Sequence, residues 1–177
     1  MSELTELLID ILKFTVPGFI VYLVVRTMLR EHFANERARG AAALRQQGRE
    51  TTLKLRFQAY ERLTLLCQRI HISGLMLRIY QDGMTAQSLR ASLFLAIQQE
   101  FEHNVTQQVY VSDQLWQIIQ LARNQLIAHI DQVAEQFAAG DPAASFKKAL
   151  LVHVAGLADD PVDKALLAIK REAANYL

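Results

Sequence analysis

One long apolar stretch stands out along the chain. From Leu7 to Leu29 the sequence reads LLIDILKFTVPGFIVYLVVRTML, and its uncharged centre, Phe14 to Val25, is apolar on every side of a helix. At about 1.5 Å per residue the stretch covers roughly 34 Å, against a hydrocarbon core of about 30 Å. An interfacial helix would need a continuous polar face. The pattern therefore predicts a transmembrane helix over about 7–29. An interfacial helix and a helix buried in the protein's own core stay open as alternatives.

Charged residues flank this stretch and predict its orientation. The uncharged centre has only 12 residues, so the side chains of Lys13, Arg26 and Arg30 would have to extend outward to the headgroup layers. Residues 1–25 carry a net charge of −2 and residues 26–56 a net charge of +5. Basic flanks stay on the cytoplasmic side of a membrane. We therefore expect a single-pass protein of the inner (cytoplasmic) membrane, with its N-terminus outside and its C-terminal part in the cytoplasm.

The hydrophobic pattern divides the chain into three parts. Residues 1–30 are the predicted membrane anchor. Residues 31–52 are polar, Ala-rich and basic, which predicts either a helical juxtamembrane stalk near anionic lipid headgroups or an ordinary solvated linker. From residue 53 onward, apolar residues recur at three- and four-residue spacing, which predicts a helical cytoplasmic domain over 53–177.

Capping signals divide this domain into about five helices. The segment 104–111 is rich in β-branched residues, but no partner strand is visible, so we interpret it as a structured loop. The pattern predicts an all-α antiparallel bundle. Its expected elements are a helix with an apolar face from Phe57 to Ile70, a short helix 74–82 capped by Ser73, a helix 86–103 capped by Thr85, a helix from Ser112 or Asp113 to about Ala139, and two helices begun by Asp141-Pro142 and Asp160-Pro161.

Composition limits the classes of protein that fit. The chain is 51% hydrophobic and 21% charged, with a net charge of +1, which excludes a disordered tail and a polybasic arm. The single cysteine, Cys67, excludes an internal disulfide framework and a cysteine zinc cluster, and its place on an apolar face favours an inert core thiol. The basic region lacks interleaved aromatic residues, so we expect no nucleic-acid partner.

The densest ionisable cluster is Glu100, Glu102 and His103. An E-x-x-H pair supplies ligands in di-iron bundles, but the chain has no second copy. We therefore expect a hydrogen-bonded helix end, with no metal, cofactor or catalytic residue. The alternative is a metal-binding or catalytic bundle that uses these three residues. Three further histidines lie scattered among apolar positions and are not expected to be ligands: His71, His129 and His153.

The segment around this cluster, EFEHNVTQQVYVSD, is polar yet aromatic. Its amides suit a tight loop and suit contact with a partner equally well, so both interpretations stay open. The candidate interaction residues are Glu100, Glu102, His103, Asn104, Gln107, Gln108, Tyr110 and Asp113.

Two segments, QAYERL (Gln58–Leu63) and EFEHNVTQQVYVSD (Glu100–Asp113), resemble an uncharacterised bacterial family of small proteins. The resemblance covers most of the chain and implies one N-terminal membrane helix before a helical cytoplasmic domain. It implies no activity. We expect a non-enzymatic, membrane-anchored interaction or scaffold protein, for example an accessory subunit of a membrane complex. Its expected partners are membrane lipid and either another protein or further copies of the chain; no small-molecule substrate is identified.

Overall fold

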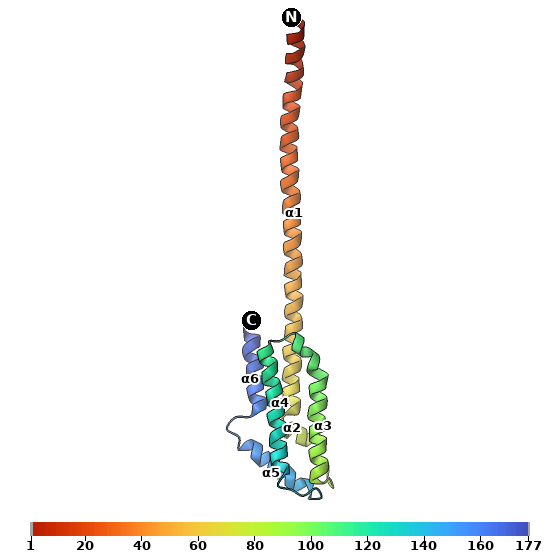
Figure 1. Cartoon of the computed structure of the whole chain (residues 1–177), viewed down its shortest axis with the longest axis vertical. Helices are drawn as coiled ribbons and strands as arrows, with labels where there is room; N and C mark the ends of the chain where they lie inside the picture. Colours follow the sequence, from red (N-terminus) through yellow and green to blue (C-terminus); the bar gives the residue numbers. More distant parts are fainter. Residues whose placement is uncertain (1, 177) are drawn as a thin grey trace. The chain divides into compact units, whose positions relative to one another are not determined.

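The computed structural model describes the backbone of residues 2–176 and the side chains of residues 13, 15, 18–30, 32, 36, 39 and 44–176. This part of the chain is all-α, as predicted, and contains seven helices (Figure 1); the prediction of about five helices concerned residues 53–177 alone. They are α1 (Ser2–Ile70), α2 (Ile72–Ile79), α3 (Ala86–Asn104), the 3-10 helix η1 (Val105–Val109), α4 (Asp113–Ala134), α5 (Ala143–Ala155) and α6 (Pro161–Ala174).

The chain divides into two compact units, Met1–Thr51 and Thr52–Leu177. In the first unit the backbone is helical from Ser2 onward, and this helix includes residues 31–51 of the predicted stalk. The described apolar side chains of the predicted span are exposed, from 41% at Leu23 to 67% at Met28. The structure contains no helix both long and apolar enough to cross a membrane among the side chains it describes. The side chains at positions 7–12, 14, 16 and 17 of the predicted span lie outside the described residues.

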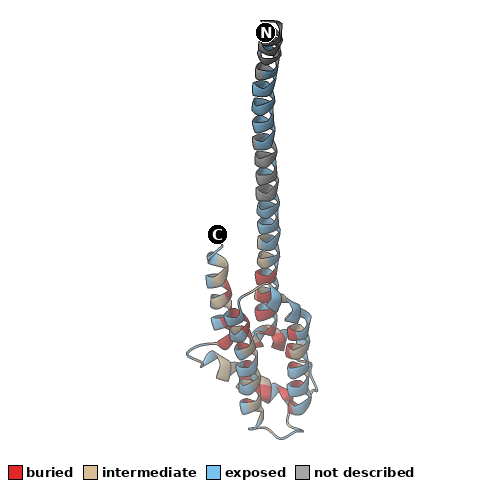
Figure 2. Cartoon of the chain, turned by 45° about the horizontal axis from the view of Figure 1, so that its top comes forward, coloured by how far each residue is buried: buried red, intermediate tan, exposed pale blue. Residues whose placement is uncertain are grey.

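The second unit is built around one apolar core. Each α-helix of this bundle places its buried residues on the face that packs against its neighbours (Figure 2), whereas η1 has no buried residue. No polar or charged side chain is buried within the described part of the chain. The predicted apolar faces are confirmed in α1, α3 and α4. Their most buried members include Leu63, Cys67, Leu89, Leu93, Ile97, Ile119, Leu126 and Ile130.

Three predicted caps are confirmed. The Thr85 hydroxyl accepts from Ser88 N at 3.2 Å, and the Ser88 hydroxyl accepts in return from Thr85 N at 3.1 Å, so α3 begins with a capping box. The Ser112 side chain caps α4 and the Asp160 side chain caps α6, where Pro161 takes the first helical position. These polar side chains satisfy backbone N–H groups that the first turn of a helix leaves unpaired.

Four boundaries differ from the prediction. The short helix begins after His71 and ends at Ile79, because its apolar face starts at Ile72. Residues 105–109 form a 3-10 turn rather than a loop. α4 ends at Ala134, where the turns that follow let Phe137 pack its ring against Phe146, with centroids 5.7 Å apart.

The fourth difference concerns the start of α5. Pro142 is its N-cap rather than its first helical residue. Pro142 pairs with Thr85 in an isolated antiparallel bridge, in which Ala143 N donates to Met84 O at 3.0 Å and Ala86 N donates to Asp141 O at 2.8 Å. This pairing holds residue 142 in an extended conformation and so delays the helix by one residue.

Candidate functional site

The Glu100–Asp113 segment covers the last turn of α3, all of η1 and the turn into α4 (Figure 1). At its start, Glu100 Oε1 accepts from Arg69 Nε at 2.6 Å and lies 3.4 Å from Arg78 Nη1. The Asn104 amide donates to the backbone oxygen of Glu100 at 2.8 Å. Glu100 therefore connects the ends of α1 and α2 to α3, and Asn104 closes the helix end.

The predicted cluster of Glu100, Glu102 and His103 is not brought together as a metal site. Glu102 accepts from the Gln98 amide at 2.8 Å, and His103 Nδ1 lies 3.0 Å from the backbone oxygen of Gln99. Each of the three residues thus has a separate partner of its own. Within the part of the chain that the structure describes, the group with metal-ligand spacing is a different one.

A polar groove runs between α1 and the end of α3, with a volume of about 810 Å³. We call it the α1–α3 groove. The side chain of Leu65, 53% exposed, lies among its polar lining. The groove draws its lining from both segments that the sequence singled out: Gln58, Glu61 and Arg62 come from the first, and Glu100, His103 and Asn104 come from the second. Two segments far apart in the sequence thus form one surface.

The rest of the predicted interaction residues lie beyond this groove. The Gln107 amide donates to the Thr106 hydroxyl at 3.3 Å, and Tyr110 N donates to Gln107 O at 3.0 Å, so both help to shape the turn. Gln108 and Asp113 are exposed. The predicted membrane-flanking residues, Lys13, Arg26 and Arg30, all lie in α1 with exposed side chains.

A second groove of similar size, about 780 Å³, lies between α4 and α6. Its lining is more apolar and includes Leu121 and Leu167, which are 55% and 48% exposed. Neither predicted segment supplies its walls, apart from Ser112 at one end. This α4–α6 groove is therefore a natural reference for tests of the α1–α3 groove.

The lone thiol is buried in the bundle. Only 1% of Cys67 is exposed, and its burial raises the pKa of the thiol to about 12. The thiolate is the reactive form of cysteine, so Cys67 is a poor nucleophile in the folded protein. Burial and the hydrogen bond to Glu172 likewise raise the pKa of Tyr60.

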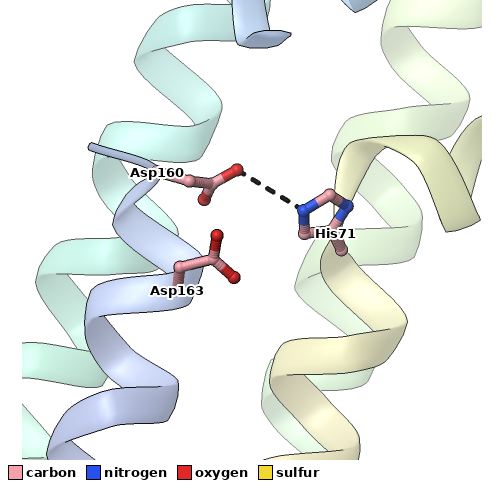
Figure 3. Close-up of side chains that lie close together, drawn as sticks. All are labelled: His71, Asp160 and Asp163. Carbon is pink, nitrogen blue, oxygen red and sulfur yellow. Dashed lines mark ion pairs between the residues drawn. The ribbon is translucent and has the colours of Figure 1, made fainter. Parts of the chain in front are cut away.

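Sequence reasoning missed one constellation. His71 lies at the junction of α1 and α2, facing Asp160 and Asp163 at the start of α6 (Figure 3). In the sequence, His71 was one of several scattered histidines, and Asp160 was a helix cap. No local pattern signals this meeting, because it depends on how α6 packs against the end of α1.

Comparison with known proteins assigns the chain to one family. The sequence model of a family of unknown function (DUF7935) matches residues 6–176. No curated protein and no solved structure matches the chain. The match extends over nearly the whole sequence, in agreement with the resemblance carried by the Gln58–Leu63 and Glu100–Asp113 segments.

Proposed function

The chain belongs to the DUF7935 family of unknown function, and we propose that it is a membrane-anchored interaction or scaffold protein, an accessory subunit of a membrane assembly. The observation that carries this proposal is the meeting of the Gln58–Leu63 and Glu100–Asp113 segments in one open groove. The bundle core is apolar throughout the described residues. The polar side chains that could bind a partner therefore lie on the surface, where a partner can contact them.

The lining of the α1–α3 groove suits a protein partner. It offers amide groups and charges of both signs around the exposed side chain of Leu65. Protein interfaces commonly combine an apolar contact at the centre with a polar, hydrogen-bonding rim. Arg69 and Glu100 hold each other in place across one end of the groove, so part of the rim is fixed before a partner binds. The expected partner is a protein segment that presents an apolar side chain to Leu65.

The N-terminal part of α1 supports the anchor in the proposal. Its side chains from Phe19 to Val25 form a continuous run of large exposed apolar groups. Apolar surface of this extent marks a site of membrane or protein contact. The net charge of +5 over residues 26–56 favours the cytoplasmic side for everything that follows the run. We propose an inner-membrane location with the N-terminus outside and the bundle in the cytoplasm.

Carbonate extraction of membranes tests the anchor. We expect the full chain to stay in the membrane pellet, and a C-terminal reporter to be active only in the cytoplasm. Val24→Arg places a charge in the run and should shift protein to the supernatant, because a charge at the centre of a span costs about 2.5–3.5 kcal/mol. Leu44→Arg, at another exposed apolar position of α1, is the matched control. Release of the unaltered chain would refute the anchor.

A photo-crosslinking residue at position 65 tests the groove in native membranes. The control is the same residue at position 121, since Leu65 and Leu121 have almost equal exposure and line grooves of similar volume. We expect one adduct of defined mass from position 65, none from position 121, and a weaker adduct when Arg62→Glu is added. An adduct of twice the chain's mass identifies the partner as a second copy. No adduct, or equal adducts from both positions, would overturn the proposed partner surface.

A further inference from the structure

Three potential ligands converge where α6 begins. His71 is the N-cap of α2, Asp160 is the N-cap of α6, and Asp163 lies in the first turn of α6. One donor atom from each lies within 4.8 Å of the other two. Figure 3 shows the imidazole and both carboxylates directed into the same space. We propose that these residues bind a divalent first-row transition-metal ion, with Zn²⁺ as its representative.

The imidazole is oriented for binding. Its Nδ1 lies 2.7 Å from the Ser73 hydroxyl, and its Nε2 lies 3.5 Å from Asp160 Oδ2. When Nδ1–H donates to Ser73, Nε2 presents its lone pair to the carboxylates, which is the arrangement common around metal-bound histidines. A nitrogen and an oxygen bound to one tetrahedral ion, with bonds of about 2.0–2.2 Å, lie roughly 3.4 Å apart. The observed separation of Nε2 and Oδ2 is close to that value.

The Asp160 carboxylate is held in place by the backbone, and within the described part of the chain the negative charge of the Asp160–Asp163 pair is left without a basic partner other than His71. Asp160 Oδ1 accepts from Val162 N at 2.7 Å, which fixes the carboxylate and leaves Oδ2 facing His71. The side-chain carboxylate of Asp163 has no hydrogen bond or ion pair to any other described residue. The nearby ammonium of Lys164 lies instead 3.0 Å from Asp159. With a neutral imidazole, the group carries two negative charges, which a divalent cation neutralises.

The donor set indicates the class of ion. One imidazole nitrogen and two carboxylate oxygens suit Zn²⁺, Mn²⁺ or Fe²⁺ better than the all-oxygen coordination that Ca²⁺ and Mg²⁺ prefer. The side chains of His71 and Asp160 are 32% and 14% exposed, so water can complete the coordination. A bound ion would connect the α1–α2 junction to the start of α6. The competing arrangement is an imidazolium–carboxylate ion pair, which needs no metal.

Metal titration distinguishes a metal site from an ion pair that needs no metal. The sample is the purified full chain, stripped with chelator and free of tags. We expect one Zn²⁺ per chain by calorimetry, a visible absorption band when Co²⁺ replaces it, and a higher melting temperature with either ion. Asp163→Asn removes a ligand at an exposed position and should weaken binding at least about tenfold, without changing the melting temperature of the metal-free protein. Asp160→Asn keeps a capping side chain while removing the charge, and it should weaken binding in the same way.

Two control variants exclude other sites. Asp159→Asn removes an adjacent acid outside the group and should bind Zn²⁺ like the unaltered chain. His129→Gln breaks up a second histidine pair, in which His129 Nδ1 lies 3.0 Å from His153 Nε2, and should also leave binding unchanged. The proposal is overturned if the unaltered chain and Asp163→Asn bind equally. It is also overturned if His129→Gln, and not Asp163→Asn, removes the binding.

Discussion

The hydroxyl of Tyr60 donates a hydrogen bond to Glu172 Oε1 across 3.1 Å and so joins α1 to α6. The same carboxylate accepts from the backbone N–H of Ser112 at 2.9 Å and from the Ser112 hydroxyl. Glu172 therefore connects three elements: α6, α1 and the residue that caps α4. Hydrogen bonds to a charged acceptor are among the stronger ones in proteins, so this carboxylate should contribute measurably to the stability of the bundle.

Replacing Glu172 should destabilise the protein. We expect Glu172→Ala to lower the free energy of unfolding by about 1–3 kcal/mol, because it leaves the Tyr60 hydroxyl and the Ser112 donors without their shared acceptor. Chemical denaturation followed by circular dichroism measures the change. Glu135→Ala, at an exposed position after α4, is the control and should stay within about 0.5 kcal/mol. Equal effects of the two substitutions would contradict this role for Glu172.

Phe146 should be among the largest single contributors to the core. Its side chain is fully buried in α5 and meets Phe137 edge-on. We expect Phe146→Ala to cost about 3–5 kcal/mol, since it removes a large apolar group and leaves a cavity. Phe94 in α3 is 50% exposed, and Phe94→Ala should cost well under half as much in the same denaturation experiment. A smaller loss at position 146 than at position 94 would show that the core is packed differently.

The thiol of Cys67 should be protected by folding. At pH 8 we expect a thiol reagent to label the native protein slowly and the denatured protein quickly, because only the unfolded chain exposes the sulfur. Absorbance of the released chromophore follows both reactions. Fast stoichiometric labelling of the native protein would mean that Cys67 is accessible.

The same burial makes stability depend on pH. The pKa of Cys67 is about 12 in the folded protein and near its ordinary value of 9 in the unfolded chain. The unfolded state therefore loses this proton first, and stability falls as the pH rises above about 9. Denaturation midpoints between pH 8 and 10 should decline less steeply in Cys67→Ala than in the unaltered chain. Identical slopes would exclude a contribution from the thiol.

Glu100 should matter less for stability than Glu172. Its partners Arg69 and Arg78 have side chains that are 57% and 41% exposed, and ion pairs open to water contribute only about 0.2–1 kcal/mol. We expect Glu100→Gln to lower the free energy of unfolding by no more than about 1 kcal/mol, with the loss shrinking at high salt. Glu102→Gln is the neighbouring control and should have almost no effect. A loss of several kcal/mol at position 100 would indicate a buried structural role.

The two Asp-Pro pairs show where sequence reasoning works and where it stops. At Asp160-Pro161 the local preferences for a cap and for proline at the first helical position decide the outcome. At Asp141-Pro142 the same dipeptide pairs with Thr85, a residue outside the helix. This bridge makes Pro142 the N-cap of α5 instead of its first helical residue. Buried helix faces were predictable because their spacing is local, whereas this boundary depends on a contact between distant segments.

The candidate sites follow the same division. The Gln58–Leu63 and Glu100–Asp113 segments were recognisable one by one, but only the packing of α1 against α3 places their side chains in one groove. No local sequence pattern predicts that His71 lies close to Asp160 and Asp163, because helix capping alone explains an aspartate at the start of a helix. Periodicity predicts which face of a helix is buried, but it does not predict which helix ends meet.

The attachment of α6 at both of its ends has a consequence for synthesis of the protein on the ribosome. α6 follows every other helix of the bundle in the sequence, yet it contacts α1 through Glu172 near its end and His71, the residue between α1 and α2, through Asp160 at its start. While the chain is being translated, the apolar faces of α1 and α4 that α6 covers stay uncovered until α6 has been made. The apolar run Phe19–Val25 precedes the bundle in the sequence, so it leaves the ribosome before the bundle can close.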